Sequence, residues 1–514
     1  MKNTLRYCLL LLAWPLISQP LMAEKMDSVA VDSVDSHFLS PAFQLKWLKL
    51  SALPLHPYWV QEEFGRSQLA VTRQNDNFIT AQQAEQESGI HVFSEGIRKV
   101  NGFWLEGGFS YRKVFSDSVG WNLSRELSSN PYYLGNIKKG NWDKDYFDLF
   151  LKAVRPIANE KLLLGIGIDY QLQQHARYND TRILINYYDL SWDVQLAYQI
   201  GQGQYIGLTA GLQNSDEKGG YRYYDDNNES FGAEEYIVYN LYGLGSFDLV
   251  RRSRYYQDFH SKRFGANYSI QKNQWRINDE FTYSSFISNY ERRSSDGGEL
   301  IIENIGDYKL KTYHNRFYAE RSQSNWMHQL VLLTKVERGK DFNNIFLGAN
   351  YFYNAFRQDL IYQLSSNPSR LSFTGKLGVE QVSKQDYNAS HAYDYTNIEM
   401  CLMAEKGWDK ADWVYKLNVG LGYRHNINAQ IDVNAQYENI VSQSIVYPEW
   451  IYGSADYLMP MVKMKVEKYL KKVGFQGSIG YKTSIATQVR SMEASLYTPE
   501  GRRDHINLGI TILH

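Results

Sequence analysis

Two groups of ionisable side chains recur at alternate positions of this chain, and each group carries mainly one sign of charge. In an extended strand, side chains point to opposite faces with a period of two, so alternate residues share a face. Where the second face is apolar, the charged face must line water, and it could orient or bind polar solutes there. If the strands close around a water-filled lumen, these residues are candidates for lining it. They are Asp169, Asp189, Asp193, Lys376, Lys416, Lys463, Lys465 and Lys482.

The acidic residues of this set come from earlier segments and the basic residues from later ones. Gln171 and Gln195 accompany the acids, and Glu467 lies among the lysines. Strands that follow one another in sequence are neighbours in an up-and-down barrel. The order of the residues therefore predicts an acidic wall and a basic wall around a polar lumen.

Catalytic and metal-binding patterns are weak in comparison. An outer-membrane hydrolase needs a serine beside a histidine and an orienting polar group. His328 falls on the apolar face of its expected strand, near a short turn, and His314 falls on the opposite, polar face of its strand. No serine is placed beside either histidine. No His or Cys spacing resembles a zinc site, and no glycine-rich phosphate loop precedes a helix. We therefore expect no catalytic residues, no metal site, no cofactor and no enzymatic activity.

Two loop segments leave alternatives open. Residues 221–229 concentrate carboxylate and amide oxygens beside tyrosines, as a calcium site would require. A solvated acidic loop tip is the simpler interpretation. Residues 251–256 form a basic counterpart, which could meet lipopolysaccharide phosphates or only solvent.

The element that must position the lumenal residues is a membrane hairpin, and residues 189–213 are its clearest example. Apolar and polar residues alternate from Leu190 to Ile200, a Gly-Gln-Gly-Gln turn follows, and alternation resumes from Ile206 to Leu212. Arms of roughly ten residues match tilted strands that cross a bilayer. A half-exposed strand of a soluble sandwich has a similar pattern, so repetition along the chain decides between them.

The pattern does repeat, with short polar turns alternating with long polar, aromatic segments. Short turns on one side and long loops on the other are typical of outer-membrane barrels. The turns occur at residues 99–102, 158–161, 201–204, 271–274, 322–325, 365–370, 407–412 and 470–473, and the long segments at 119–145, 214–235, 289–307, 385–393, 426–456 and 488–504. Eight turns predict an all-β, antiparallel transmembrane barrel of about 16–18 strands, with short periplasmic turns and long extracellular loops.

Two regions fit this scheme less well. Residues 236–260 could form a further hairpin or a structured surface loop. Asp279 lies on an otherwise apolar face, which is tolerable near a membrane interface and costly at mid-bilayer. The chain ends in strand register, with His514 in the place where barrels commonly carry an aromatic terminal residue.

Composition and the N-terminus agree with export to an outer membrane. Mean hydropathy is -0.48 and no apolar run beyond the N-terminus reaches the roughly 18 residues of a spanning helix. A net charge of -1 gives no indication of nucleic acid. Residues 1–23 are expected to be a secretory signal, 24–65 a periplasmic extension or small plug, and 66–514 the barrel. Cys401 is then the single cysteine of the mature chain, so no internal disulfide is expected.

Short aromatic motifs of the N-terminal half carry a resemblance to a known family. They are Gly102-Phe103-Trp104, Phe109-Ser110-Tyr111, Asn130-Pro131-Tyr132-Tyr133, Gly140-Asn141 and Tyr146. With these motifs the chain resembles an uncharacterised outer-membrane barrel family of the Bacteroides group. The resemblance implies a barrel that works beside a TonB-dependent transporter and a surface lipoprotein, and it implies no catalytic or binding residues.

Three functions from different classes follow. The first is a transport-associated barrel, an accessory subunit or channel for nutrient uptake, whose polar lumen is partly occluded by residues 24–65 or by a long loop. The second is a structural or assembly subunit of an outer-membrane complex, and the third an outer-membrane hydrolase. The expected partners are the lipid bilayer and lipopolysaccharide, with an outer-membrane transporter or surface lipoprotein as a possible further partner. The expected location is the outer membrane of a Gram-negative cell.

Overall fold

The structure is a computed structural model that describes most of the 514-residue chain. The described residues are 54–60, 63–125, 127, 129–159, 161–224, 234–250, 253–296, 299–366, 369–470 and 473–514. The predicted secretory signal, residues 24–53 of the predicted extension, residues 225–229 of the candidate calcium loop, and Arg251 and Arg252 lie outside this set.

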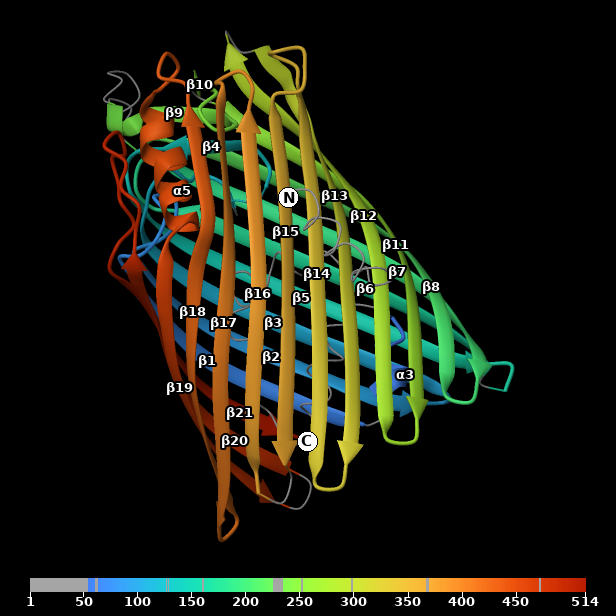
Figure 1. Cartoon of the computed structure of the whole chain (residues 1–514). Helices are drawn as coiled ribbons and strands as arrows, with labels where there is room; N and C mark the ends of the chain where they lie inside the picture. Colours follow the sequence, from blue (N-terminus) through green and yellow to red (C-terminus); the bar gives the residue numbers. More distant parts are fainter. Residues whose placement is uncertain are drawn as a thin grey trace, which may run out of the picture.

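Eighteen antiparallel strands form one closed sheet (Figure 1). Apart from three short strands in the loops, consecutive strands pair with each other, and the last strand pairs with the first from Arg66↔Leu513 to Asp76↔Arg503. The strands are β1 (Phe64–Asp76), β2 (Gln86–Val100), β3 (Phe103–Val119), β5 (Gly140–Ile157), β6 (Leu162–Arg177), β7 (Arg182–Gly201), β8 (Gln204–Arg222), β11 (Ser253–Lys272), β12 (Trp275–Asp296), β13 (Glu299–Gln323), β14 (Trp326–Asn343), β15 (Tyr351–Ser366), β16 (Leu371–Asp386), β17 (His391–Lys410), β18 (Trp413–Val433), β19 (Asp456–Leu470), β20 (Val473–Gln488) and β21 (Arg502–Leu513).

All eight predicted short turns join strands at one end of the barrel. The first is the two-residue turn Asn101-Gly102, where both residues have positive φ, 49° and 82°. Asn-Gly is favoured there because a type I′ turn needs two left-handed residues and follows the twist of the flanking strands. At the same end, Gly65 and His514 exchange backbone hydrogen bonds of 2.6 and 2.9 Å, which close the sheet.

The two faces of the sheet differ as the alternation predicts. Leu208 and Leu402 point outward and are 68% and 72% exposed, whereas Thr209 and Met403, their neighbours in sequence, are buried inside. A closed antiparallel sheet satisfies its backbone polar groups between strands, and this allows an apolar outer face to meet lipid. The predicted outer-membrane barrel is confirmed, at the upper end of the expected strand count. No helix among the described residues is long and apolar enough to cross a membrane.

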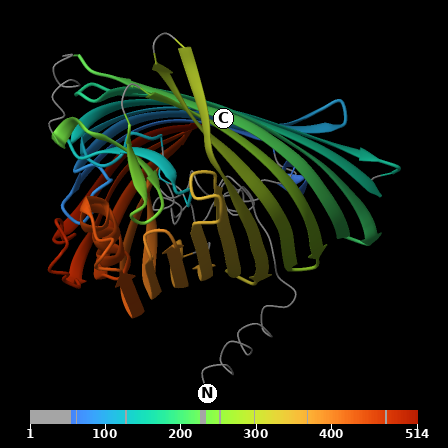
Figure 2. The same cartoon turned by 90° about the horizontal axis from the view of Figure 1, so that it is seen from above.

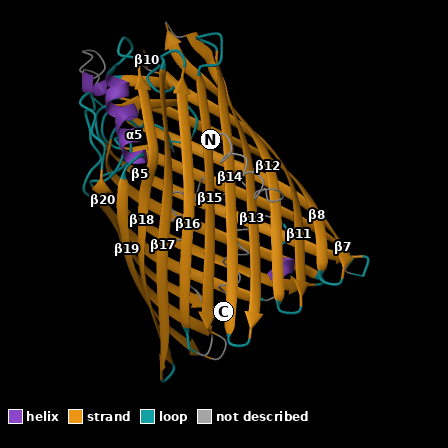
Figure 3. Cartoon of the chain, viewed as in Figure 1, coloured by secondary structure: helices purple, strands orange, loops and turns teal. Residues whose placement is uncertain are grey.

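The long connections carry the remaining elements (Figure 3). A three-stranded sheet consists of β4 (Tyr132–Asn136), β9 (Val238–Tyr242) and β10 (Phe247–Val250), with the 3-10 helix η3 (Glu234–Tyr236) before β9. The π-helix η4 (Ser442–Val446) runs directly into α5 (Tyr447–Gly453), and a separate helix, α3 (His56–Val60), precedes β1. Seen along the barrel, the small sheet lies within the outline of the ring of strands (Figure 2).

Strands reach further into the predicted loops than expected, since β8 pairs up to Arg222 within residues 214–235 and β18 up to Val433 within residues 426–456. Residues 289–307 were expected to be a loop, but β12 and β13 pair there up to Asp296↔Glu299, so this region is a strand hairpin. It extends beyond the neighbouring strands at the loop end (Figure 1). Residues 236–260 divide between the small sheet and the start of β11. Sequence alternation alone does not distinguish a barrel strand from a strand that continues past the rim.

Short turns mark the periplasmic end of such barrels, which gives the first testable prediction. Tyr437 is 52% exposed at the long-loop end, and Ser324 is exposed in a short turn. A maleimide reagent too large to pass porins should label Tyr437→Cys on intact cells, and Ser324→Cys only after the outer membrane is permeabilised. Cys401 is buried and serves as the unlabelled background. The reverse labelling pattern would mean that the barrel has the opposite orientation.

Candidate functional site

The eight candidate lumen-lining residues lie on the face opposite the exposed apolar side chains. Asp189 and Asp193 are buried on β7, where they alternate with exposed Leu190 and Trp192. Lys416 and Lys465 are buried at paired positions of β18 and β19. The other four, Asp169, Lys376, Lys463 and Lys482, are half-buried on the same inward phase.

The expectation of one acidic wall and one basic wall is wrong, because neighbouring strands contribute opposite charges. Arg263 of β11 donates to Asp193 over 2.8 Å, in the region expected to be acidic. In the region expected to be basic, Lys416 donates to both oxygens of Glu467, at 2.8 and 3.0 Å. Charges of opposite sign therefore meet within both regions, and at these buried positions each charge has its counter-charge nearby.

A mixed cluster occupies the inward face of β15 to β17. The Lys376 ammonium lies 3.3 Å from Asp359 and 2.8 Å from Glu399. Arg357 donates to Asp359, yet its side chain is 43% exposed although it points inward. Solvent therefore reaches this part of the interior, and the middle of the barrel has a polar, water-accessible wall.

At the short-turn end, α3 and the two residues before it pack against the inner wall. The Leu55 backbone N–H donates to Gln195 Oε1 over 3.0 Å, and Pro54 lies against Gly165, where an added Cβ would come within 3.0 Å of it. Leu55 and Tyr58 belong to an apolar cluster with wall residues Ile97, Trp104, Val154, Leu163, Ala197 and Tyr205. These contacts hold the helix inside the barrel.

A buried cluster of three ionisable side chains, His56, Glu106 and Lys152, connects the same helix to the wall. His56 is 0% exposed, and its Nδ1 lies 2.7 Å from Glu106 Oε2 on β3. Lys152 on β5 lies 3.5 Å from the same oxygen. Glu106 thus contacts two possible cations from different elements, and it would be costly to leave any of the three without partners.

At the long-loop end, the turn between β9 and β10 is bound to the wall by one carboxylate. Asp386, at the end of β16, is fully buried. Its Oδ2 accepts from the backbone N–H groups of Leu244 and Ser246, at 2.9 and 3.2 Å, and its Oδ1 accepts from Ser246 Oγ at 2.9 Å. Three donors from one turn on one buried side chain form a strong anchor, because a buried donor left without its acceptor costs free energy.

A second carboxylate anchors β4. Asp341, near the end of β14, accepts from the Tyr132 hydroxyl at 2.8 Å and from the backbone N–H groups of Asn350 and Tyr351. Burial and the neighbouring Asp341 both raise the pKa of Tyr132, so its hydroxyl remains a donor. The Tyr132 ring stacks on Tyr290, and Tyr290 stacks on Tyr255, with centroids 5.7 and 5.8 Å apart.

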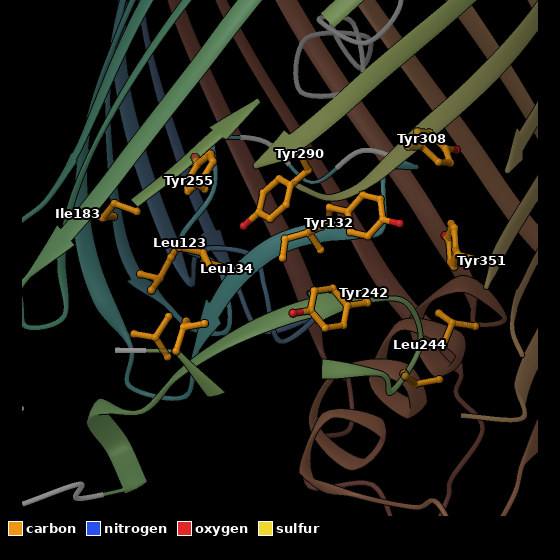
Figure 4. Close-up of a cluster of buried hydrophobic side chains, with 14 of the residues drawn as sticks. Leu123, Tyr132, Leu134, Ile183, Tyr242, Leu244, Tyr255, Tyr290, Tyr308 and Tyr351 are labelled. Atoms are coloured by element: carbon orange, nitrogen blue, oxygen red, sulfur yellow. The ribbon is translucent and has the colours of Figure 1, made fainter. Parts of the chain in front are cut away.

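These rings are part of an apolar cluster that joins the small sheet, α5 and the barrel wall (Figure 4). We call β4, β9, β10, η4 and α5 the outer cap. Under it lies a cavity of about 40 Å³, bordered by Tyr133, Lys384 and Glu449 among others, with room for only a few water molecules.

Sequence reasoning missed both anchoring carboxylates and the Glu106 group. Asp341, Asp386 and Glu106 each lie on the inward phase of a strand, so the alternation could have included them. Their partners come from segments up to 209 residues away in sequence, and no local pattern indicates such contacts.

The structure also shows where two other residues discussed from the sequence lie, His328 and Asp279. His328 points outward and bonds the Tyr362 hydroxyl over 2.8 Å, as expected of a girdle residue. Asp279 also points outward, and Asn315 donates to it over 2.9 Å. Among the described residues, no group of three or more His, Cys, Asp or Glu side chains is placed to hold a metal ion.

Comparison of the sequence with models of known protein families shows to which family the chain belongs. The model of a family described as a family of unknown function (DUF6850) matches residues 53–514. The chain belongs to this family. The predicted membership of an uncharacterised family is thereby confirmed, whereas its Bacteroides grouping stays a prediction. No curated protein matches the chain.

The solved structures with a similar barrel share little sequence identity with this chain. The ferric yersiniabactin uptake receptor FyuA from Yersinia pestis is 10% identical, with 88% of this chain and 80% of that chain covered and a TM-score of 0.42. The ferric-catecholate import receptor Fiu from E. coli K12, in its closed form, is 8% identical, with 88% and 82% covered and a TM-score of 0.42. The copper transporter OprC is 7% identical, with 88% and 80% covered and a TM-score of 0.42.

Proposed function

We propose that this family member is a transport-associated outer-membrane barrel whose polar lumen is closed at both ends by its own chain. The observation that carries the proposal is the contrast between the middle and the ends. Charged side chains such as Arg357 meet solvent in the middle. At the ends, α3 and the outer cap are each held against the wall by a buried apolar cluster together with buried polar contacts. The middle is therefore open to water, whereas packed side chains lie at both ends.

A nutrient would pass only when both closures move, and this requires a signal or a partner. The resemblance described above suggests which partners to test, namely a TonB-dependent transporter and a surface lipoprotein. In that arrangement the barrel is an accessory subunit. We propose no catalytic role, since His314 and His328 lie on opposite faces of the sheet and do not form a common site.

The second candidate is a structural subunit, and the large apolar cluster of the outer cap favours it. More than twenty buried residues join the cap to the wall, and burial on this scale suits a permanent seal. A structural subunit would use its outer surface and never conduct.

Planar-bilayer recording of the purified mature protein tests occlusion directly. We expect little or no steady conductance at neutral pH, although a barrel of eighteen strands is wide enough for an aqueous channel. Large and steady conductance from the intact protein would refute the closed lumen. The two functional candidates are separated by opening the barrel deliberately and recording whether it then conducts.

A further inference from the structure

Four basic side chains form a compact patch on the outer, lipid-facing side of β13 and β14. Lys309 and Lys311 alternate with buried Tyr308 and Leu310, so both lysines point outward. Arg338 and Lys340 occupy the outward phase of the next strand. Register pairs Lys309 with Lys340 and Lys311 with Arg338 directly across the two strands. All four are exposed.

This arrangement is unfavourable without a counter-ion. Directly opposed side chains in an antiparallel pair have Cβ atoms roughly 5 Å apart, and like charges there repel. Within the part of the chain that the structure describes, none of the four forms an ion pair. Among the described residues of these two strands, Asp307, two residues before Lys309, is the acid that adjoins them on the same face, so the patch keeps a strong positive charge.

The distance along β14 from the patch to the ring of aromatic residues near the periplasmic end matches the thickness of the hydrocarbon core. On β14, Trp326 and His328 mark the girdle, and Leu330, Leu332, Thr334 and Val336 follow on the outward phase before Arg338. Ten residues separate His328 from Arg338, which is about the length with which a tilted strand crosses the hydrocarbon core. The cations therefore lie at the headgroup level of the outer leaflet.

We propose that Lys309, Lys311, Arg338 and Lys340 form a binding site for the phosphorylated headgroup of an outer-leaflet glycolipid, that is, the phosphates of lipopolysaccharide. Phosphate oxygens can accept from several cations at once, and the Arg338 guanidinium offers a planar pair of donors. A bound phosphate would remove the repulsion across both pairs. Lys262 of β11 extends the row at the same level, since Ser285 pairs with both Lys262 and Lys311.

The test measures binding of purified lipopolysaccharide to the mature barrel in detergent by native mass spectrometry. Two variants are compared with the wild type, Lys311→Gln with Arg338→Gln and Lys309→Gln with Lys340→Gln, so that failure of one to fold leaves the other. The control is Lys272→Gln with Lys410→Gln, which removes two exposed positive charges at the short-turn end. Heat-modifiable migration on gels checks that each barrel is folded.

We expect each patch variant to lose at least tenfold in affinity and the control variant to bind as the wild type does. Enzymatically dephosphorylated lipopolysaccharide should bind the wild type as weakly as the intact glycolipid binds the patch variants, and salt should weaken wild-type binding. Unchanged binding in both patch variants would overturn the proposal. So would full competition by equimolar inorganic phosphate, which would indicate a site for free phosphate. If the variants instead lose only a co-purifying acidic protein, the patch is a protein interface and the glycolipid assignment is wrong.

Discussion

A barrel that lacks residues 24–60 and also lacks β9 and β10 should conduct steadily in planar bilayers, while the mature protein and each single deletion should conduct little. The reason is that α3 and the outer cap would each block the same ion path at a different end. When one of them is deleted, the other still limits the current. In the second deletion, residues 237–250 are replaced by a short Gly-Ser linker. The readout is single-channel conductance with its dependence on voltage and salt.

A finer variant of this experiment uses the anchor of the cap. In the barrel that lacks residues 24–60, Asp386→Ala leaves the buried donors of Leu244 and Ser246 without their acceptor, at a cost of about 1–3 kcal/mol for each. We expect intermittent openings. Asp394→Ala is the matched control, because the bond that Asp394 on the adjacent strand accepts from Asn428 is a long one of 3.4 Å. Silence from every variant would favour the structural-subunit alternative, and full conductance after one deletion would show that the other closure does not seal.

Glu106→Ala should destabilise the folded barrel by about 3–5 kcal/mol, the usual loss when one partner of a buried charged group is removed. His56 and Lys152 would remain buried without the carboxylate that both contact. Glu106→Gln keeps an acceptor for His56 and should lose less. Denaturant unfolding in detergent measures the free energy, and hydrogen exchange of residues 54–60 reports whether α3 leaves the wall.

Glu63→Ala is the control for this second experiment. Glu63 is exposed near the same rim and accepts one backbone hydrogen bond from Lys99 over 3.1 Å, so its removal should cost less than about 1 kcal/mol. If Glu106→Ala is as mild as the control and residues 54–60 remain protected, the charged group does not hold α3. The apolar contacts of Leu55 and Tyr58 would then suffice.

The sequence by itself determined the barrel, its eight short turns and the inward phase of its polar residues. These features are local: a period of two sets the face of every strand residue, and a turn such as Asn101-Gly102 fixes its own hairpin. Alternation along the strand is therefore enough to assign Lys416 and Asp193 to the inner face. The same locality made residues 289–307 resemble a loop, because a hairpin beyond the rim no longer needs an apolar face.

Only the tertiary structure decided which charges meet and what fills the ends of the barrel. Arg263 pairs with Asp193 from 70 residues away, and Tyr132 bonds Asp341 from 209 residues away. Such contacts depend on closure of the ring and on the inward path of the loops. Alternation along one strand carries no information on either. Two separated walls of charge were predicted for that reason, and local pairing replaced them because a buried charge needs its counter-charge within a few ångströms.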